Sequence, residues 1–190
     1  MSLSLNERIR IIGSNTSLAW ASFDIWWTYA SHETRPDYLE TMNQFSEFFR
    51  FDEHAHFVNM IMLVSSLYDP TGKTITVRSV INKAVAEGHT ALKGMVPVCD
   101  TFADDAAIKG VLHMRNKLYA HRDTASTVAG VYADAALTAD DIRDLIQRAQ
   151  WMIDRVVEVV GGQPVVRNTI VGEHVSKMLK TLKKEDRRGD

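Results

Sequence analysis

Residues 138–162 read TADDIRDLIQRAQWMIDRVVEVVGG, and this stretch decides the fold class. Its apolar residues recur at steps of three and four, the spacing of one face of an α-helix. They are Ile142, Leu145, Ile146, Ala149, Ile153, Val156, Val157 and Val160. Thr138 and Asp141 resemble a capping box at the start, and Gly161-Gly162 ends the helix. The chain therefore contains a long amphipathic helix whose apolar face must be covered by other elements.

The same helical spacing continues through the first 70 residues. Ser4 and Glu7 form a capping box for a first helix that we expect to end near Arg35-Pro36, because the residue before a proline disfavours the helical conformation. Pro36 suits the first turn of a second helix. We expect that helix to bend around 51–53 and to stop at 69–72, whose sequence DPTG is a turn signal.

The remaining segments complete an all-α architecture, and no stretch shows a convincing strand pattern. We expect a short helix from Thr76 to Gly88, an ambiguous stretch over 89–99, a fourth main helix over 101–120, a loop over 122–137 and a last helix over 173–183. The prediction is an up-and-down four-helix bundle with additional short helices. It forms one domain over 1–190, with a charged tail that frays from about residue 184.

Composition excludes several classes of protein. The 190 residues are 45% hydrophobic and 24% charged, with a net charge of -2, which excludes disordered, collagen-like and disulfide-scaffold chains. Such a balance does not indicate a general nucleic-acid-coating protein. Cys99 is the only cysteine, so no intramolecular disulfide forms. No secretory signal is visible and the apolar runs are too short to span a membrane, so we expect a cytoplasmic protein without a membrane partner.

The segment RNKLYAHRD, residues 115–123, concentrates three cations and a histidine at the end of a predicted buried helix. Arginine offers phosphate a planar fork of donors, and histidine exchanges a proton near neutral pH. RNA carries its own nucleophile, the 2′-hydroxyl, so a base, an acid and a cation suffice for strand cleavage. The set Arg115, Asn116 and His121 is therefore our candidate catalytic group, and its chemistry needs no metal and no cofactor.

The spacing from Arg115 to His121 is weak evidence by itself. On an ideal helix a residue six positions on lies about 240° round the axis, so one straight helix does not aim both side chains at one point. Either the helix loosens at its end or a second chain completes the site. Similar spacings occur from Arg50 to His56 and from Arg167 to His174, but only 115–121 lies in an apolar helix followed by a long packed one.

RNKLYAHRD resembles the signature of the HEPN superfamily (higher eukaryotes and prokaryotes nucleotide-binding). Within that superfamily it is most similar to the abortive-infection branch. That signature is an arginine, a polar residue, a mostly hydrophobic stretch and a histidine. The string LVSSLYDP over 63–70 is similar to the Leu-Phe-Asp-type helix end of the same branch. The resemblance covers roughly residues 20–160, and only the nine-residue string is sharp.

The resemblance implies a helical bundle, usually a homodimer, in which motif residues of two protomers face one cleft. Many such proteins are metal-independent ribonucleases of phage-defence or toxin–antitoxin systems, whereas others bind nucleotides or protein partners without catalysis. By position Arg115 binds the scissile phosphate, Asn116 orients either Arg115 or the phosphate, and His121 is the general acid or base. We add three substrate-binding candidates, Lys117, Tyr119 and Arg122. The implied partners are a second copy, RNA or a nucleotide, and an antitoxin or another defence-system protein. Certain toxin members carry a modified tyrosine two residues after the histidine, where this chain has Asp123.

Plainer interpretations stand beside these. Lys117, His121 and Arg122 could simply complement a helix dipole, with Arg115 paired to an acid of the second helix. The acidic stretch with His54 and His56 could suggest a metal site, but a solvated helix face is favoured. The tryptophans could stack bases, although their helical spacing favours a place in the core or at a dimer interface. They are Trp20, Trp26, Trp27 and Trp151.

Overall fold

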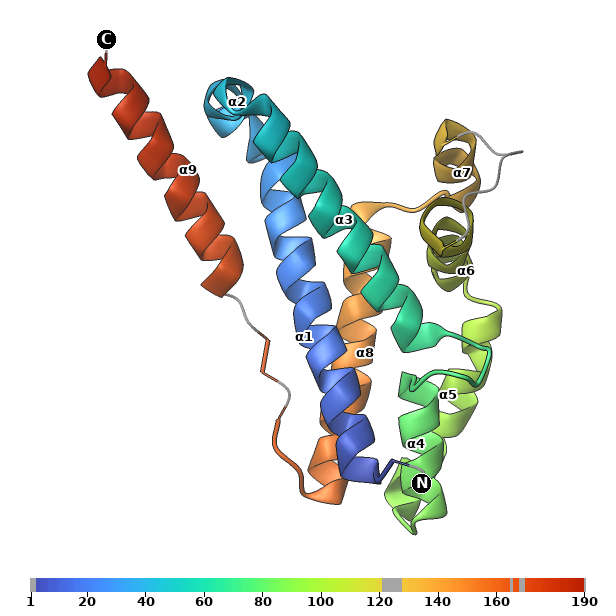
Figure 1. The fold of residues 1–190 in the computed structure, drawn as a ribbon. Helices are drawn as coiled ribbons and strands as arrows, with labels where there is room; N and C mark the ends of the chain where they lie inside the picture. Colours follow the sequence, from blue (N-terminus) through green and yellow to red (C-terminus); the bar gives the residue numbers. More distant parts are fainter. Residues whose placement is uncertain (1–2, 121–127, 165, 168–169, 190) are drawn as a thin grey trace.

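The computed structural model describes residues 3–120, 128–164, 166–167 and 170–189, with backbone alone at 119–120, 128–129 and 185–189. Every regular element in these ranges is helical (Figure 1). The elements are α1 Leu5–Ala30, α2 Arg35–Gln44, α3 Ser46–Tyr68, α4 Val77–Ala86, η1 Thr90–Met95, α5 Val96–Asp100, η2 Thr101–Ala103, α6 Ala106–Met114, η3 Arg115–Ala120, α7 Val128–Ala135, α8 Ala139–Val160 and α9 Ile170–Gly189. The predicted all-α class is confirmed.

The starts of α1, α4 and α8 and the end of α8 follow local sequence signals. Capping boxes at Ser4, Thr76 and Thr138 open α1, α4 and α8, each with the side chain accepting a hydrogen bond from a backbone N–H of the first turn. Such caps satisfy N–H groups that the helix itself leaves without partners. Gly161 ends α8 in the left-handed conformation (φ 82°), which costs a residue without Cβ little. The predicted limits of α8 are confirmed.

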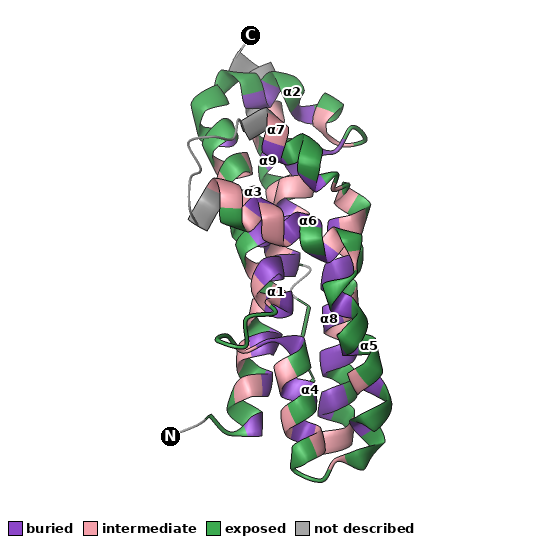
Figure 2. Cartoon of the chain, turned by 90° about the vertical axis from the view of Figure 1, so that its right-hand side faces the viewer, coloured by how far each residue is buried: buried purple, intermediate pink, exposed green. Residues whose placement is uncertain are grey.

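The core lies between α1, α3 and α8, which run side by side, while α4 and α5 close the end near the N-terminus (Figure 1). Figure 2 shows that the buried residues follow the inward faces of these helices. The middle of the apolar face of α8 is fully buried, with Leu145, Ile146 and Ile153 all at 0% exposure. Tyr68 ties α3 to α8, because its hydroxyl donates to the carbonyl of Leu145 at 2.6 Å.

A second, smaller core joins α9 to α1, α2 and the first turn of α3. Its buried members are Ile25, Tyr29, Tyr38, Met42, Phe49 and Leu179. The strap before α9 is fastened by Arg167, whose guanidinium lies 3.8 Å from the ring centroid of Trp20 and 3.1 Å from Asp24. Helix α9 is longer than the predicted 173–183, since it already begins at Ile170.

The predicted second helix is divided in two, and the predicted bend is misplaced. The chain leaves the helical conformation at Phe45 (φ -118°, ψ 41°), between α2 and α3. Residues 51–53 are helical and lie within α3. The carboxylates of Asp52 and Glu53 contact residues of the preceding helices. The hydroxyl of Tyr29 donates to Asp52 at 2.9 Å, and Arg35 lies 3.4 Å from Glu53. The first helix ends at Ala30 rather than near Arg35, which instead starts α2.

Two further expectations in the second half were wrong. The helix expected over 101–120 begins only at Ala106, where the Asp105 carboxylate accepts from the N–H of Ile108 at 3.1 Å. The stretch expected as a loop over 122–137 contains α7. Helix α7 packs on Gly110 of α6 so closely that a Cβ there would lie 2.6 Å from a backbone oxygen of Ala135. The small residues of α7 allow this close approach. They also leave α7 without large apolar residues at steps of three and four, so the spacing pattern did not predict a helix here.

None of the described helices is both long enough and apolar enough to cross a membrane.

Candidate functional site

Arg115 stands where α6 changes into the π-helix η3. Short π-helical turns widen the backbone ladder and often occur at functional sites. The supporting helix is fixed from the other end, since Asp105 both caps α6 and pairs with Arg148 of α8 at 2.6 Å. Burial raises the pKa of Asp105, but its bonds to Arg148 and Ile108 outweigh this and the pKa lies below its ordinary value. The position of Arg115 is therefore set by the packing of α6 against α8.

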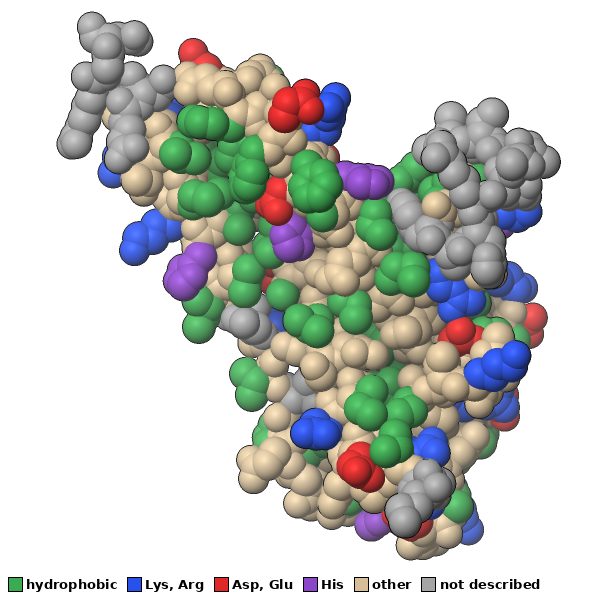
Figure 3. All heavy atoms as spheres, in the orientation of Figure 1, with side chains coloured by type: hydrophobic (Ala, Val, Ile, Leu, Met, Phe, Trp, Pro, Cys, Tyr) green, Lys and Arg blue, Asp and Glu red, His purple; other side chains and the backbone are tan. Residues whose placement is uncertain are grey.

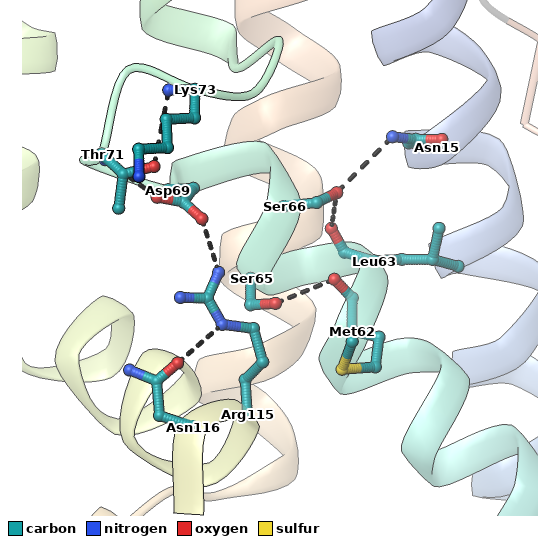
Figure 4. Close-up of polar contacts among 10 residues, drawn as sticks. All are labelled: Asn15, Met62, Leu63, Ser65, Ser66, Asp69, Thr71, Lys73, Arg115 and Asn116. Carbon is teal, nitrogen blue, oxygen red and sulfur yellow. Dashed lines mark hydrogen bonds and ion pairs between the residues drawn. The ribbon is translucent and has the colours of Figure 1, made fainter. Parts of the chain in front are cut away.

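The side chain of Arg115 reaches to the end of α3 and meets Asp69 there (Figure 4). The Nη1 of Arg115 lies 2.6 Å from the Oδ2 of Asp69, and the two side chains are only 18% and 8% exposed. A cation at this place also complements the negative end of the α3 dipole. The pair joins the two stretches that carry the HEPN resemblance, 63–70 and 115–123.

Asp69 is held in its charged form by two residues, Thr71 and Arg115. Its Oδ1 accepts from the backbone N–H of Thr71 at 2.8 Å, and its Oδ2 accepts from Arg115. Burial raises the pKa of Asp69, but the bonds from Thr71 and Arg115 outweigh burial, and the pKa lies below its ordinary value. The Asp69 carboxylate is thus a fixed anion that orients the arginine.

Asn116 holds the other edge of the same guanidinium. Its Oδ1 accepts from the Nε of Arg115 at 3.0 Å (Figure 4). A guanidinium has five N–H donors, and these contacts with Asp69 and Asn116 use Nε and Nη1. An arginine held at two edges presents the rest of its fork in one orientation.

The other predicted site residues are placed only in part. Lys117 is half-buried in η3. The backbone of Tyr119 belongs to the same π-helix, and its side chain lies outside the described part. His121 and Arg122 both lie outside the described residues. The structure therefore brings Arg115 and Asn116 together, adds Asp69, and leaves the role of His121 a prediction.

The expected loosening of the helix end is observed, and it begins at Arg115 itself. The estimate of about 240° between Arg115 and His121 assumed α-helical geometry, which does not hold over 115–120. Completion of the site by a second chain stays a prediction.

Sequence reasoning missed the part played by Asp69. In the sequence Asp69 is part of a turn signal and the acid of a Leu-Phe-Asp-like helix end, and neither feature indicates which residue the carboxylate contacts. The plainer interpretation came nearer, because it expected an acid of the second helix as partner for Arg115. That contact is present, since Asp69 directly follows α3.

The two other Arg–His spacings do not build a comparable site. Arg50 is exposed and pairs with its neighbour Glu47 at 2.5 Å. Arg167 stacks on Trp20 and pairs with Asp24, so it fastens the chain before α9. No group of three or more side chains suited to hold a metal ion occurs in the described ranges.

Comparison with known proteins gives one match. Residues 14–181 match the family model HEPN_AbiU2, described as AbiU2. The matched range contains α3, Asp69 and the whole 115–123 segment. No curated protein and no solved structure matches the chain significantly.

Proposed function

Because the chain belongs to the AbiU2 family of HEPN-type abortive-infection proteins, we propose that it is a metal-independent endoribonuclease of a phage-defence or toxin–antitoxin system. It acts in the cytoplasm as a homodimer, with a composite site at the interface and with an antitoxin or another defence-system protein as partner. The observation that carries the proposal is the Arg115 guanidinium, fixed between Asp69 and Asn116 at the start of a π-helix.

Arg115 binds the scissile phosphate in this proposal. The charge of that group increases as the 2′-oxygen attacks, and a donor already fixed in place stabilises it without reorganisation. Asp69 and Asn116 are positioning residues, because they hold the guanidinium and do not touch the substrate. Asp69 also offsets the arginine charge, which keeps the site from binding phosphate indiscriminately.

His121 moves the proton in the same step. As a base it takes the proton of the 2′-hydroxyl, or as an acid it gives one to the departing 5′-oxygen. The second transfer is made by His121 of the partner subunit across the interface. The products are a 2′,3′-cyclic phosphate and a free 5′-hydroxyl, and no co-reactant is consumed.

An apolar stripe on the outer face of α3 supports the dimer. We call it the α3 seam: Phe48, Phe51, Ala55, Val58 and Met62. Its members follow one another at alternating steps of three and four, the spacing of a coiled-coil contact. Phe48 and Phe51 are 56% and 74% exposed. A second copy of this chain, placed across a twofold axis, covers the seam with the same residues.

The decisive experiment is RNA cleavage in the presence of EDTA. We expect the purified protein to cleave single-stranded RNA under these conditions, and His121→Ala to abolish cleavage. Arg115→Ala should lower the rate by about 10²–10³-fold, the usual loss when a donor to a developing charge is removed. His174→Ala is the matched control, since His174 is exposed on α9 and follows Arg167 at a similar spacing. That variant should keep full activity.

A second function is favoured by the same ion pair. Because Asp69 neutralises Arg115, the site could bind a nucleotide or a protein partner without turnover. This alternative predicts nucleotide binding with no cleavage by the native protein or by any variant. Cleavage that stops in EDTA, or that survives in His121→Ala, would contradict the ribonuclease proposal.

A further inference from the structure

A hollow of about 490 Å³ opens between α3, α7 and the start of α8. The notch between the upper part of α3 and the α6–α7 side is visible in Figure 3. The hollow arises because α8 covers the inward face of α3 only along the C-terminal half of α3. The N-terminal half of that face extends past the first residues of α8. The size of the hollow lies in the range of pockets that bind small molecules.

Three aromatic rings form the wall of this hollow. Trp26 of α1 lies 5.3 Å from Phe57 of α3, and Phe57 lies 6.0 Å from Tyr132 of α7, measured between ring centroids. Tyr132 is 39% exposed and Trp26 and Phe57 are half-buried. The rings therefore form an aromatic cluster from three separate helices, with interplanar angles of 47° and 31°, in which Tyr132 is the most exposed ring.

The rim of the hollow is polar along one side. Glu53 and His54 of α3 line it together with Arg50. A carboxylate accepts hydrogen bonds, a guanidinium donates them, and an imidazole does either. The combination of a π-surface with donors and acceptors at one edge matches the chemistry of a nucleobase, which stacks by its faces and forms hydrogen bonds by its edge.

We infer that this hollow binds one unstacked base of an RNA strand. The inference rests on the proposed function for the source of the base. Met114, the last residue of α6, lines the hollow and directly precedes Arg115, the first residue of η3, so the two places are adjacent along the chain. Phe57 and Asp69 are separated by about 18 Å along α3 at 1.5 Å per residue. A single strand covers that distance with about five stacked nucleotides or fewer extended ones.

The hollow and the α3 seam are separate surfaces. Arg50, Glu53, His54 and Phe57 lie about a third of a turn around α3 from the seam. A second copy on the seam therefore uses none of the side chains that would hold the base.

The test is calorimetric titration with AMP, GMP, CMP and UMP, with inorganic phosphate as the competitor. We expect at least one nucleotide to bind, and Tyr132→Ala to weaken its binding by about 5- to 150-fold, the usual cost of removing a stacking ring. Tyr132→Phe keeps the ring and should bind as the native protein does. Trp151→Ala is the matched control, because Trp151 is 59% exposed on α8 and does not line the hollow.

Four results would overturn the inference: no binding of any nucleotide, unchanged binding in Tyr132→Ala, an equal loss in Trp151→Ala, or complete competition by phosphate alone. Thermal unfolding of each variant shows whether it is folded, and Tyr132 is exposed enough for its removal to leave the core intact. Nucleotide binding is measured by calorimetry, without cleavage. The titration can therefore be interpreted even if the ribonuclease proposal fails. A failure to bind free nucleotides likewise leaves the outcome of the cleavage assay interpretable, because that assay is scored on the His121 and Arg115 variants.

Discussion

The two ends of α3 differ in opposite ways from an ordinary surface helix. At its C-terminal end a charged side chain, Asp69, is 8% exposed and pairs with Arg115, which is 18% exposed. At its N-terminal end Phe48 and Phe51, which would normally be enclosed, face solvent. Burying charge and exposing large apolar side chains both cost free energy. The protein therefore carries two destabilising arrangements on one helix, and we assign the first to the reaction and the second to a second copy.

The largest expected effect is at the buried end. Asp69→Ala leaves the partly buried Arg115 guanidinium without its anion, and loss of one partner of such a pair costs about 2–3 kcal/mol. We expect the free energy of unfolding, measured by urea denaturation, to fall by this amount.

The double variant Asp69→Ala/Arg115→Ala is the control for that effect. Removing both partners should restore much of the lost stability, because no buried charge remains. A double variant less stable than Asp69→Ala alone would show that the ion pair is not the source of the loss.

Substitutions at the exposed end of α3 should change the dimer dissociation constant and leave the free energy of unfolding of the monomer unchanged. Phe48→Ser with Phe51→Ser changes surface residues, so the monomer should keep its free energy of unfolding to within about 0.5 kcal/mol. Dimerisation should weaken by about 1–2 kcal/mol for each ring, the cost of removing central interface residues. Sedimentation equilibrium measures the change in the dissociation constant.

Leu18→Ser is the matched control for the seam variants. Leu18 is 51% exposed on α1 and does not belong to the α3 seam. It should leave the dissociation constant unchanged. If the dimer persists in the Phe48→Ser/Phe51→Ser variant but is lost in Leu18→Ser, the interface does not lie on the α3 seam.

The smallest expected effect is a difference in acid sensitivity. The folded-state pKa of Asp69 lies below its unfolded value, so the unfolded chain takes up the proton first as the pH falls. The stabilisation by Asp69 is present above an unfolded pKa of about 3.9 and is lost as the pH falls through the folded pKa. The Asp69→Asn variant lacks this titrating carboxylate, so its stability should not depend on pH through this residue.

Denaturation curves collected between about pH 5 and pH 2 measure this difference. The native protein should lose stability more steeply than Asp69→Asn over that range. Subtracting the two curves cancels the other carboxylates whose pKa is lowered, such as Asp105. Parallel curves would mean that Asp69 is not a charged partner of Arg115.

Local signals in the sequence predicted helices better than they predicted interruptions. The caps at Ser4, Thr76 and Thr138 were readable, because a cap depends on residues three positions apart. The break at Phe45 has no proline or glycine to announce it. One turn after the break, Phe49 is buried against Tyr29 with ring centroids 5.5 Å apart. Such an interruption is decided by packing between helices, which no local pattern contains.

The candidate site shows the same division. The type of chemistry at Arg115 and Asn116 was readable from a nine-residue string and its resemblance to the HEPN signature. The contact with Asp69 was not, since 46 residues separate the two partners along the chain. The same holds for the hollow, whose three rings come from α1, α3 and α7.

The sequence by itself determined the all-α class, the limits of α8 and the family resemblance, because each depends on spacing within one segment. Only the tertiary structure decided where α3 begins, that η3 widens at Arg115, and which acid orients that arginine. The physical reason is that hydrogen-bonded helical turns are local, whereas the ion pair of Asp69 with Arg115 becomes favourable only when packing removes both side chains from water.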